Sequence, residues 1–151
     1  MQKKWTVIAI LLGIGLSSLC HSESNEISFV ENIETERMLV EIANTIFGVE
    51  VARTPEEKSY GLMFRQNIPP KTGMIFLNEA PQLMGVWMKN TFVSLDVLFF
   101  DENKKVIGIF ENLKPLDETP HRLAEPALGM LELPAGTVKE YKIKIGDKMT
   151  F

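Results

Sequence analysis

Six consecutive residues, Leu95 to Phe100, constrain the fold more than any other part of this chain. Side chains alternate between the two sides of a strand, and here both sides are apolar except at Asp96. A strand that is apolar on both sides is typical of the interior of a β-structure. Asp96 is therefore expected to be partly buried, and a buried charge without a partner costs several kcal/mol. The segment predicts an interior strand that holds a polar group.

Strands predominate in the rest of the pattern, and the chain shows no regular strand–helix–strand rhythm. Alternation and β-branched content predict strands at 38–43, 45–52, 74–77, 84–89, 94–100, 106–110 and 128–133, with a short last strand at 149–151. Residues 101–105 are expected to form a hairpin turn, and residues 111–126 a long surface loop. The predicted class is mainly β (α+β): an antiparallel β-sandwich or barrel-like domain with one clear helix.

The clear helix is expected to begin at Pro55. Thr54 can cap the N-terminus, Pro55 suits the first helical position, and Glu57 completes a capping box. We expect the helix to end near Phe64, with an apolar stretch that packs on a sheet, before residues 69–73 force a turn. A further helical turn is predicted at 137–141.

The N-terminus has the pattern of a secretory signal peptide. Lys3 and Lys4 precede an uncharged apolar run at 5–19, and the sequence becomes polar from Cys20. Cleavage after Ser22 is the first interpretation; lipidation of Cys20 and an uncleaved anchor are alternatives. The apolar run is shorter than the roughly 20 residues that span a bilayer comfortably. The protein is therefore expected to be exported, periplasmic or secreted, with a membrane tether through Cys20 or the apolar segment as an alternative.

Removal of residues 1–22 would leave 129 of the 151 residues, with 14 basic side chains against 20 acidic ones and a net charge of −6. This balance argues against nucleic-acid binding, which needs clustered Lys and Arg. No cysteine would remain for a disulfide, so core packing must stabilise the fold. The acidic and polar segment 23–37 is expected to form a flexible leader, and residues 38–151 are expected to form a single β-rich domain.

Several motifs occur together in a fixed order. They are Tyr-Gly-Leu-Met-Phe-Arg at 60–65, Gly-Met-Ile-Phe at 73–76, Val-Trp-Met-Lys-Asn-Thr at 86–91, Leu-Asp-Val-Leu-Phe at 95–99, Met-Leu-Glu-Leu at 130–133 followed by Gly136, and Ile-Gly-Asp at 145–147. With them the chain, over roughly residues 47–151, resembles the prokaryotic domain of unknown function family number 192. The resemblance implies a compact, mainly β domain that is often exported, and it implies no established activity.

Polar residues among apolar strand neighbours mark the candidate site. Asp96 and Glu132 both lie in apolar strand segments, and Arg65 and Lys89 are the cations nearest to them in the motifs. One hypothesis is a structural ion-pair network, in which Arg65 or Lys89 neutralises Asp96 or Glu132. The other is that the same groups bind a ligand.

In a ligand site, Trp87 would offer a stacking face, and Asn90 and Thr91 would form hydrogen bonds. Arg65 or Lys89 would bind an anionic group of the ligand. The predicted ligand-binding residues are Arg65, Trp87, Lys89, Asn90, Thr91, Asp96 and Glu132.

Catalysis has weaker support. Asp96 and Glu132 could serve as the paired carboxylates of a small hydrolase, which in glycosidases lie about 5 to 10 Å apart. The sequence has no Gly-x-Ser-x-Gly motif and no spacing typical of a zinc or calcium site. Met84 and Met88 suggest a Cu(I) site, but methionine more often fills a core. His121, the only histidine after the signal, could titrate near neutral pH or lie at the rim of a site, but an exposed bystander is the first expectation.

The sequence thus predicts no catalytic residue, metal or cofactor. The predicted function is an exported domain that binds a small polar ligand or an envelope partner protein. A small hydrolase that uses Asp96 and Glu132 is one alternative, and a non-catalytic accessory domain of the envelope is another.

Overall fold

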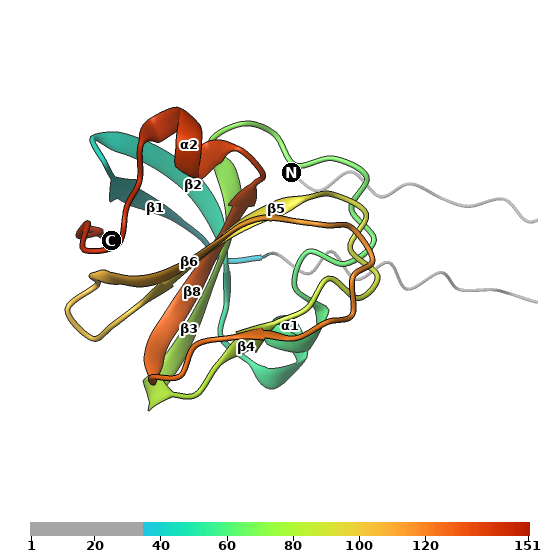
Figure 1. Ribbon diagram of the computed structural model, residues 1–151, viewed down its shortest axis with the longest axis horizontal. Helices are drawn as coiled ribbons and strands as arrows, with labels where there is room; N and C mark the ends of the chain where they lie inside the picture. The colour runs from blue at the N-terminus through green and yellow to red at the C-terminus, as the bar shows by residue number, and fades with distance from the viewer. Residues whose placement is uncertain (1–34) are drawn as a thin grey trace, which may run out of the picture. The chain divides into compact units, whose positions relative to one another are not determined.

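The structure is a computed structural model that describes residues 35–151 (Figure 1). The predicted signal peptide (1–22) and most of the predicted leader (23–37) lie outside the described residues. The mainly β class is confirmed. The elements are β1 (Arg37–Ile42), β2 (Thr45–Ala52), α1 (Pro55–Tyr60), β3 (Thr72–Gln82), β4 (Gly85–Val86), β5 (Leu95–Phe100), β6 (Val106–Leu113), β7 (His121–Arg122), β8 (Ala127–Pro134) and α2 (Thr137–Tyr141).

Six strands form one sheet in the order β1-β2-β3-β8-β5-β6, and β4 pairs with β7 in a small second sheet. The main sheet is mixed because β2 and β3 run parallel, with α1 in the connection between them. The other neighbouring strands are antiparallel. β1 and β6 are the outer strands, so the sheet does not form a closed barrel, which was one of the alternatives predicted from the sequence.

Each face of the main sheet carries its own apolar core. In Figure 1, α2 lies on one side of the sheet, and α1 and β4 lie on the other. The core on the α2 side contains Leu98, Phe100, Leu131, Leu133 and Val138 among others. The core on the α1 side contains Met74, Phe76, Val97, Phe99 and Met130 among others. All six residues of β5 are buried, as their two-sided apolar pattern predicted.

The C-terminal residues join the two outer strands at one end of the sheet. Thr150 forms a bridge with Glu41 at the end of β1, and Lys148 forms a bridge with Lys105 beside β6. Met149 lies between them and is fully buried. The strand expected at 149–151 is therefore reduced to these isolated bridges.

The helix α1 begins as predicted and ends earlier. Its capping box forms, but the helix stops at Tyr60 because Gly61, with φ 49° and ψ −130°, leaves the helical conformation. The N–H of Gly61 still donates the last helical bond, to the carbonyl of Glu57. Tyr60 and Phe64, which were expected to pack on the sheet, are exposed. Of the strand predicted at 84–89 only β4 forms, because the N–H of Met88 bonds to the loop carbonyl of Asp117.

The loop predicted at 111–126 is shorter than expected, since β6 continues to Leu113 and β7 lies within the loop. The turn at 137–141 is confirmed as α2. Among the residues that the structure describes, no helix is long and apolar enough to cross a membrane.

Candidate functional site

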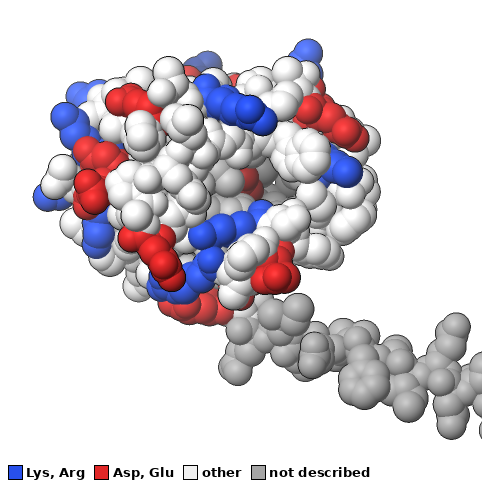
Figure 2. All heavy atoms as spheres, turned by 90° about the horizontal axis from the view of Figure 1, so that it is seen from below, with Lys and Arg blue, Asp and Glu red and all other residues white. Residues whose placement is uncertain are grey.

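A small cavity opens on the face of the sheet that carries α1 and β4. Figure 2 views the protein from this side and shows a hollow with acidic atoms inside it. The cavity has a volume of about 80 Å³. Its walls come from α1, the segment after α1, β3, β4, β5 and β8, and the residues are Lys58, Ser59, Tyr60, Gly61, Leu62, Met63, Phe76, Gly85, Val86, Trp87, Thr91, Leu95, Met130 and Glu132.

Among residues 35–151, Glu132 is the only acidic residue that lines this cavity. It lies on β8, opposite Met74 of β3 and Val97 of β5, so apolar buried side chains flank it on both neighbouring strands. Only 5% of its surface is exposed. Burial raises the pKa of the Glu132 carboxyl to about 8, because the charged form loses its hydration.

No hydrogen bond or ion pair connects the Glu132 carboxyl to any residue of the described chain. Every fully inaccessible side-chain oxygen among these residues has a hydrogen-bond partner. Because the Glu132 oxygens have no partner, they must be accessible, and they lie at the cavity. A buried carboxyl without a partner destabilises a fold. Glu132 is therefore a buried carboxyl whose hydrogen-bonding capacity is not used by the described residues.

Thr91 supplies a second polar group to the cavity and is also buried. Its hydroxyl donates to the carbonyl of Lys89 at 3.2 Å, so the lone pairs of the oxygen remain to accept a hydrogen bond. The ammonium group of Lys58, a further lining residue, donates to the side-chain oxygen of Asn78 at 2.8 Å. Lys58 thus has its own partner and leaves Glu132 unpaired.

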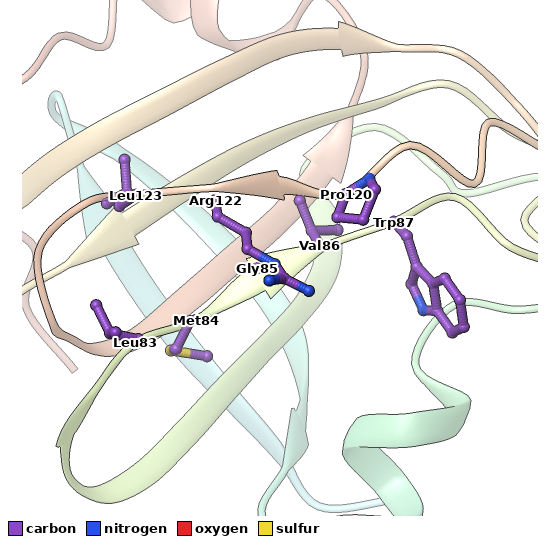
Figure 3. Close-up of a pocket in the computed structure, with 8 residues that line it drawn as sticks. All are labelled: Leu83, Met84, Gly85, Val86, Trp87, Pro120, Arg122 and Leu123. Carbon is purple, nitrogen blue, oxygen red and sulfur yellow. The ribbon is translucent and has the colours of Figure 1, made fainter.

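Trp87 forms a wall that the cavity shares with two larger, open hollows. The first has a volume of about 470 Å³ and lies along β4 and β7. Figure 3 shows Leu83, Met84 and Leu123 at one end of it and Pro120 and Trp87 at the other, with the Arg122 side chain crossing over Gly85. A Cβ atom at Gly85 would meet Arg122 Cγ at 2.5 Å, so the glycine makes room for this crossing.

The second open hollow has a volume of about 550 Å³ and contains Lys89 and Asn90. Lys89 Nζ lies 5.0 Å from the centroid of the Trp87 ring, a cation–π contact. Asn90 has a φ of 52°, and its carbonyl accepts from the N–H of Phe64 at 2.8 Å. This bond fixes the segment around Trp87 against the segment after α1.

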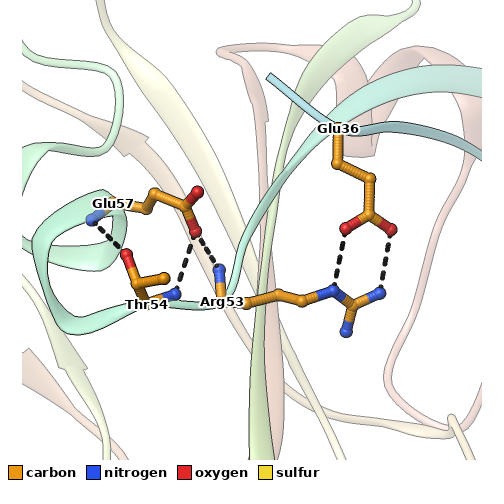
Figure 4. Close-up of polar contacts among 4 residues, drawn as sticks. All are labelled: Glu36, Arg53, Thr54 and Glu57. Carbon is orange, nitrogen blue, oxygen red and sulfur yellow. Dashed lines mark hydrogen bonds and ion pairs between the residues drawn. The ribbon is translucent and has the colours of Figure 1, made fainter. Parts of the chain in front are cut away.

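The helix α1 is held in place at its N-terminus (Figure 4). The Thr54 hydroxyl accepts from the N–H of Glu57, while the Glu57 carboxylate accepts from the N–H of Thr54 at 2.9 Å and of Arg53 at 2.7 Å. The guanidinium of Arg53 binds Glu36 through two bonds of 2.9 and 3.0 Å. These contacts set the position from which α1 presents Lys58 and Tyr60 to the cavity.

Asp96 has a structural role in the sheet. Its two oxygens accept from the N–H of Asn112 and from the N–H of Val138, each at 2.9 Å. Two residues of β6 lie opposite Asp96 where the β5–β6 register shifts, so the carboxylate replaces the missing acceptor at a β-bulge. Both oxygens are engaged, and Asp96 does not line the cavity.

Asp96 and Glu132 point to opposite faces of the sheet. Asp96 lies opposite Leu133, and Glu132 lies opposite Val97, the next residue after Asp96 on β5. Because successive residues of a strand point to opposite faces, the two acidic side chains point to different sides of the sheet. Leu133 belongs to the core on the α2 side and Val97 to the core on the α1 side. Asp96 and Glu132 therefore do not form the carboxylate pair that the hydrolase hypothesis requires.

Arg65 lies apart from this cavity, against β2. Its guanidinium binds the Glu50 carboxylate through two bonds of 2.6 Å, and the Arg65 hydrogen bonds lower the pKa of Glu50. The expected ion-pair network is thus wrong: Arg65 pairs with Glu50, Lys89 contacts Trp87, and neither cation reaches an acidic group of the predicted network.

The structure gathers Trp87, Thr91 and Glu132 around one cavity, with Lys89 and Asn90 in the next hollow. It leaves Arg65 and Asp96 elsewhere. Sequence reasoning missed the contributions of Tyr60 and Met63, because a longer helix was expected to bury this stretch. The partner of Arg65 carried a usable signal, since Glu50 is an acidic residue between buried Val49 and Val51.

Comparisons with known proteins agree with this fold. The family DUF192, described as "Uncharacterized ACR", matches residues 38–151. A crystal structure of a protein of unknown function from Novosphingobium aromaticivorans DSM 12444 has a TM-score of 0.75 and 36% identity, covering 80% of this chain and 89% of that chain. A Sinorhizobium meliloti 1021 protein labelled a candidate transcription regulator has a TM-score of 0.75 and 33% identity, covering 77% and 94%. No curated protein matches the chain.

Proposed function

This chain belongs to the DUF192 family of uncharacterised proteins, and we propose that its domain is a binding module for a small polar ligand. The ligand enters the cavity between Trp87 and Glu132. The half-exposed Trp87 ring provides the contact surface at the mouth, while Glu132 and Thr91 provide hydrogen-bonding groups at the interior.

The unpaired carboxyl of Glu132 carries this proposal. The Glu132 carboxyl forms no hydrogen bond or ion pair with the described residues, and its neighbours on both adjacent strands are apolar. Groups that weaken a fold in this way are typical of binding and catalytic sites. Glu132 is the acidic residue of this site, and no second acid or base pairs with it, which favours ligand binding over catalysis.

The test is a screen of the protein against small amines, amides, sugars and carboxylates, followed by NMR. We expect at least one compound class to shift the signals of the Trp87 indole N–H and the Thr91 amide. Trp87→Leu and Glu132→Gln should each weaken this response. Leu39→Ala serves as the control, because Leu39 is an exposed apolar residue that lines none of the three hollows. A screen without any shift at this cavity at millimolar concentration would refute the proposal.

An exposed aromatic cluster supports a second candidate, the binding of an envelope partner protein. The rings of Tyr60 and Phe64 lie 5.8 Å apart, and those of Phe64 and Phe92 lie 6.1 Å apart. All three side chains are exposed, and such patches often mark contact surfaces. A photo-crosslinker at position 64 should then capture one partner that a crosslinker at Ile145 does not. Equal capture at both positions argues against this candidate.

Export is part of the proposal and is supported by the N-terminal pattern of residues 1–22. The chain also has a net charge of −4, which gives no support for a nucleic-acid partner. Fractionation of cells that produce the full chain tests export. Recovery of the uncleaved chain in the cytoplasm would contradict it.

A further inference from the structure

We infer that the group that enters the cavity is a primary alkylammonium, and that its charge pairs with Glu132. This inference rests on the proposed function and names the chemical class of the ligand. It stands on three properties of the cavity: the hydrogen-bonding character of its polar groups, its size, and the side chains that surround the carboxyl.

The buried polar groups of the cavity accept hydrogen bonds. In its ionised form the Glu132 carboxylate only accepts hydrogen bonds, and the Thr91 hydroxyl has already committed its proton to the Lys89 carbonyl. A guest that binds the ionised carboxylate and the Thr91 oxygen together must therefore be a donor. An ammonium group has three N–H donors and no acceptor, so it matches this arrangement and supplies the counter-charge that Glu132 lacks.

The volume restricts the guest to a small head group. An apolar cavity of about 150 Å³ can hold a benzene ring, and this cavity measures about 80 Å³. It has room for a CH₂–NH₃⁺ group and is smaller than the cavity that holds a benzene ring. The rest of the ligand must therefore extend past Trp87 into the open hollows on either side of it.

The surrounding side chains favour a cation with an apolar stem. Trp87, Tyr60 and Phe76 present aromatic surfaces, and Met63 and Met130 present thioethers. Aromatic faces attract cations, and both kinds of side chain pack well against methylene groups. The lining also contains Lys58, whose ammonium donates to Asn78 and forms no ion pair with Glu132.

Binding should release a proton. With its raised pKa, the Glu132 carboxyl is largely protonated at neutral pH in the free protein. The reaction is then R–NH₃⁺ plus Glu132–COOH giving R–NH₃⁺···⁻OOC–Glu132 plus H⁺, which balances in atoms and charge. Lys58 and Tyr60 are the other titratable groups of the lining, and both come from α1; β3, β4, β5 and the 87–91 segment contribute no titratable group to it.

The experiment titrates the full-length protein with n-butylamine, n-butanol and butyrate, which share one carbon chain, by NMR and calorimetry. We expect butylamine to bind at least tenfold more tightly than butanol, with butyrate weakest. The butylamine affinity should rise from pH 6 to pH 8, and binding at pH 7 should release about one proton per site when buffers of different ionisation enthalpy are compared.

Glu132→Gln should reduce butylamine affinity at least tenfold and abolish its pH dependence, and it should reduce butanol affinity by a much smaller factor. The matched control is Glu102→Gln, because Glu102 is an exposed glutamate in the β5–β6 turn and lines none of these hollows. Butylamine binding that is unaffected by Glu132→Gln would overturn the inference.

Two further outcomes separate this inference from the proposed function. If butanol, butyrate or a sugar binds at Trp87 and Thr91 while butylamine does not, the domain is a ligand-binding module and the alkylammonium inference is wrong. If no probe and no compound of the wider screen shifts these signals, both fail together.

Discussion

The carboxylate of Asp96 accepts a hydrogen bond from the backbone N–H of Val138 at 2.9 Å, across 42 residues of sequence. This bond ties β5 to the first turn of α2, a helix that has no side-chain cap of its own at Gly136. The second oxygen of Asp96 accepts from Asn112 at the β-bulge of β6. One fully buried side chain thus satisfies two backbone donors in different parts of the fold.

Asp96→Ala should therefore lower the free energy of unfolding by about 3 kcal/mol, because the buried N–H of Val138 and the partly buried N–H of Asn112 lose their acceptor. Urea denaturation measures this loss. Asp96→Asn keeps one acceptor oxygen and should cost less than Asp96→Ala. Equal stability of Asp96→Ala and the parent protein would show that water replaces the carboxylate.

Glu132 should make the protein less stable as the pH rises. Its folded pKa of about 8 lies above the ordinary value of 4.5, so the folded state retains a proton that the unfolded chain releases. The free energy of unfolding should then fall between pH 4.5 and about 8, by up to about 1.4 kcal/mol per pH unit, and level off above this range.

Glu132→Gln removes this titration. The difference in stability between the variant and the parent protein should grow in favour of the variant from pH 5 to pH 8, as measured by urea denaturation at each pH. A difference that stays constant with pH would mean that the carboxyl is hydrated in the folded state.

The ion pair of Arg65 and Glu50 should stabilise the protein at neutral pH. Arg65 lowers the pKa of Glu50, so the contribution is complete above pH 4.5 and is lost as the pH falls through the lowered folded pKa. Glu50→Gln should cost about 1 kcal/mol at pH 7, and this cost should shrink in acid. The matched comparison is Glu36→Gln, whose pair with Arg53 is half exposed and should contribute less.

Gly61→Ala should destabilise the protein at the end of α1. Gly61 has φ 49° and ψ −130°, a conformation that disfavours any residue with a Cβ atom, and that atom would meet the Phe76 ring at 3.2 Å. We expect a loss of about 1–3 kcal/mol in thermal or urea unfolding. Gly48→Ala is the control, since the nearest atom to its Cβ is Leu39 Cδ2 at 4.0 Å. Equal effects of the two changes would contradict this account.

Much of the sheet could be predicted from local patterns, because alternation is a property of neighbouring residues. The predictions at 45–52 and 94–100 agree with β2 and β5 within one residue. The parallel pairing of β2 with β3 could not be predicted in this way, since partner and direction depend on contacts between distant segments. The same limit applies to 84–89, where Met88 finds its acceptor in the loop at Asp117.

For the candidate site, the sequence identified polar residues in apolar strands and did not show which side chains meet. Glu132 and Asp96 carry the same local signal, yet one is unpaired in a cavity and the other holds two backbone N–H groups. Strand register separates them, because each strand in the pair places its acidic residue on a different face. Register is set by the whole sheet and has no local signature at either residue.

The position of β8 governs when this fold can form. Residues 127–134 come near the end of the chain but lie between β3 and β5, and so they join β1-β2-β3 to the β5-β6 hairpin. During synthesis the two groups of strands have no shared neighbour until β8 has left the ribosome. For a protein that crosses a membrane before folding, as we propose for this one, such a late-arriving central strand would help to keep the chain open for translocation.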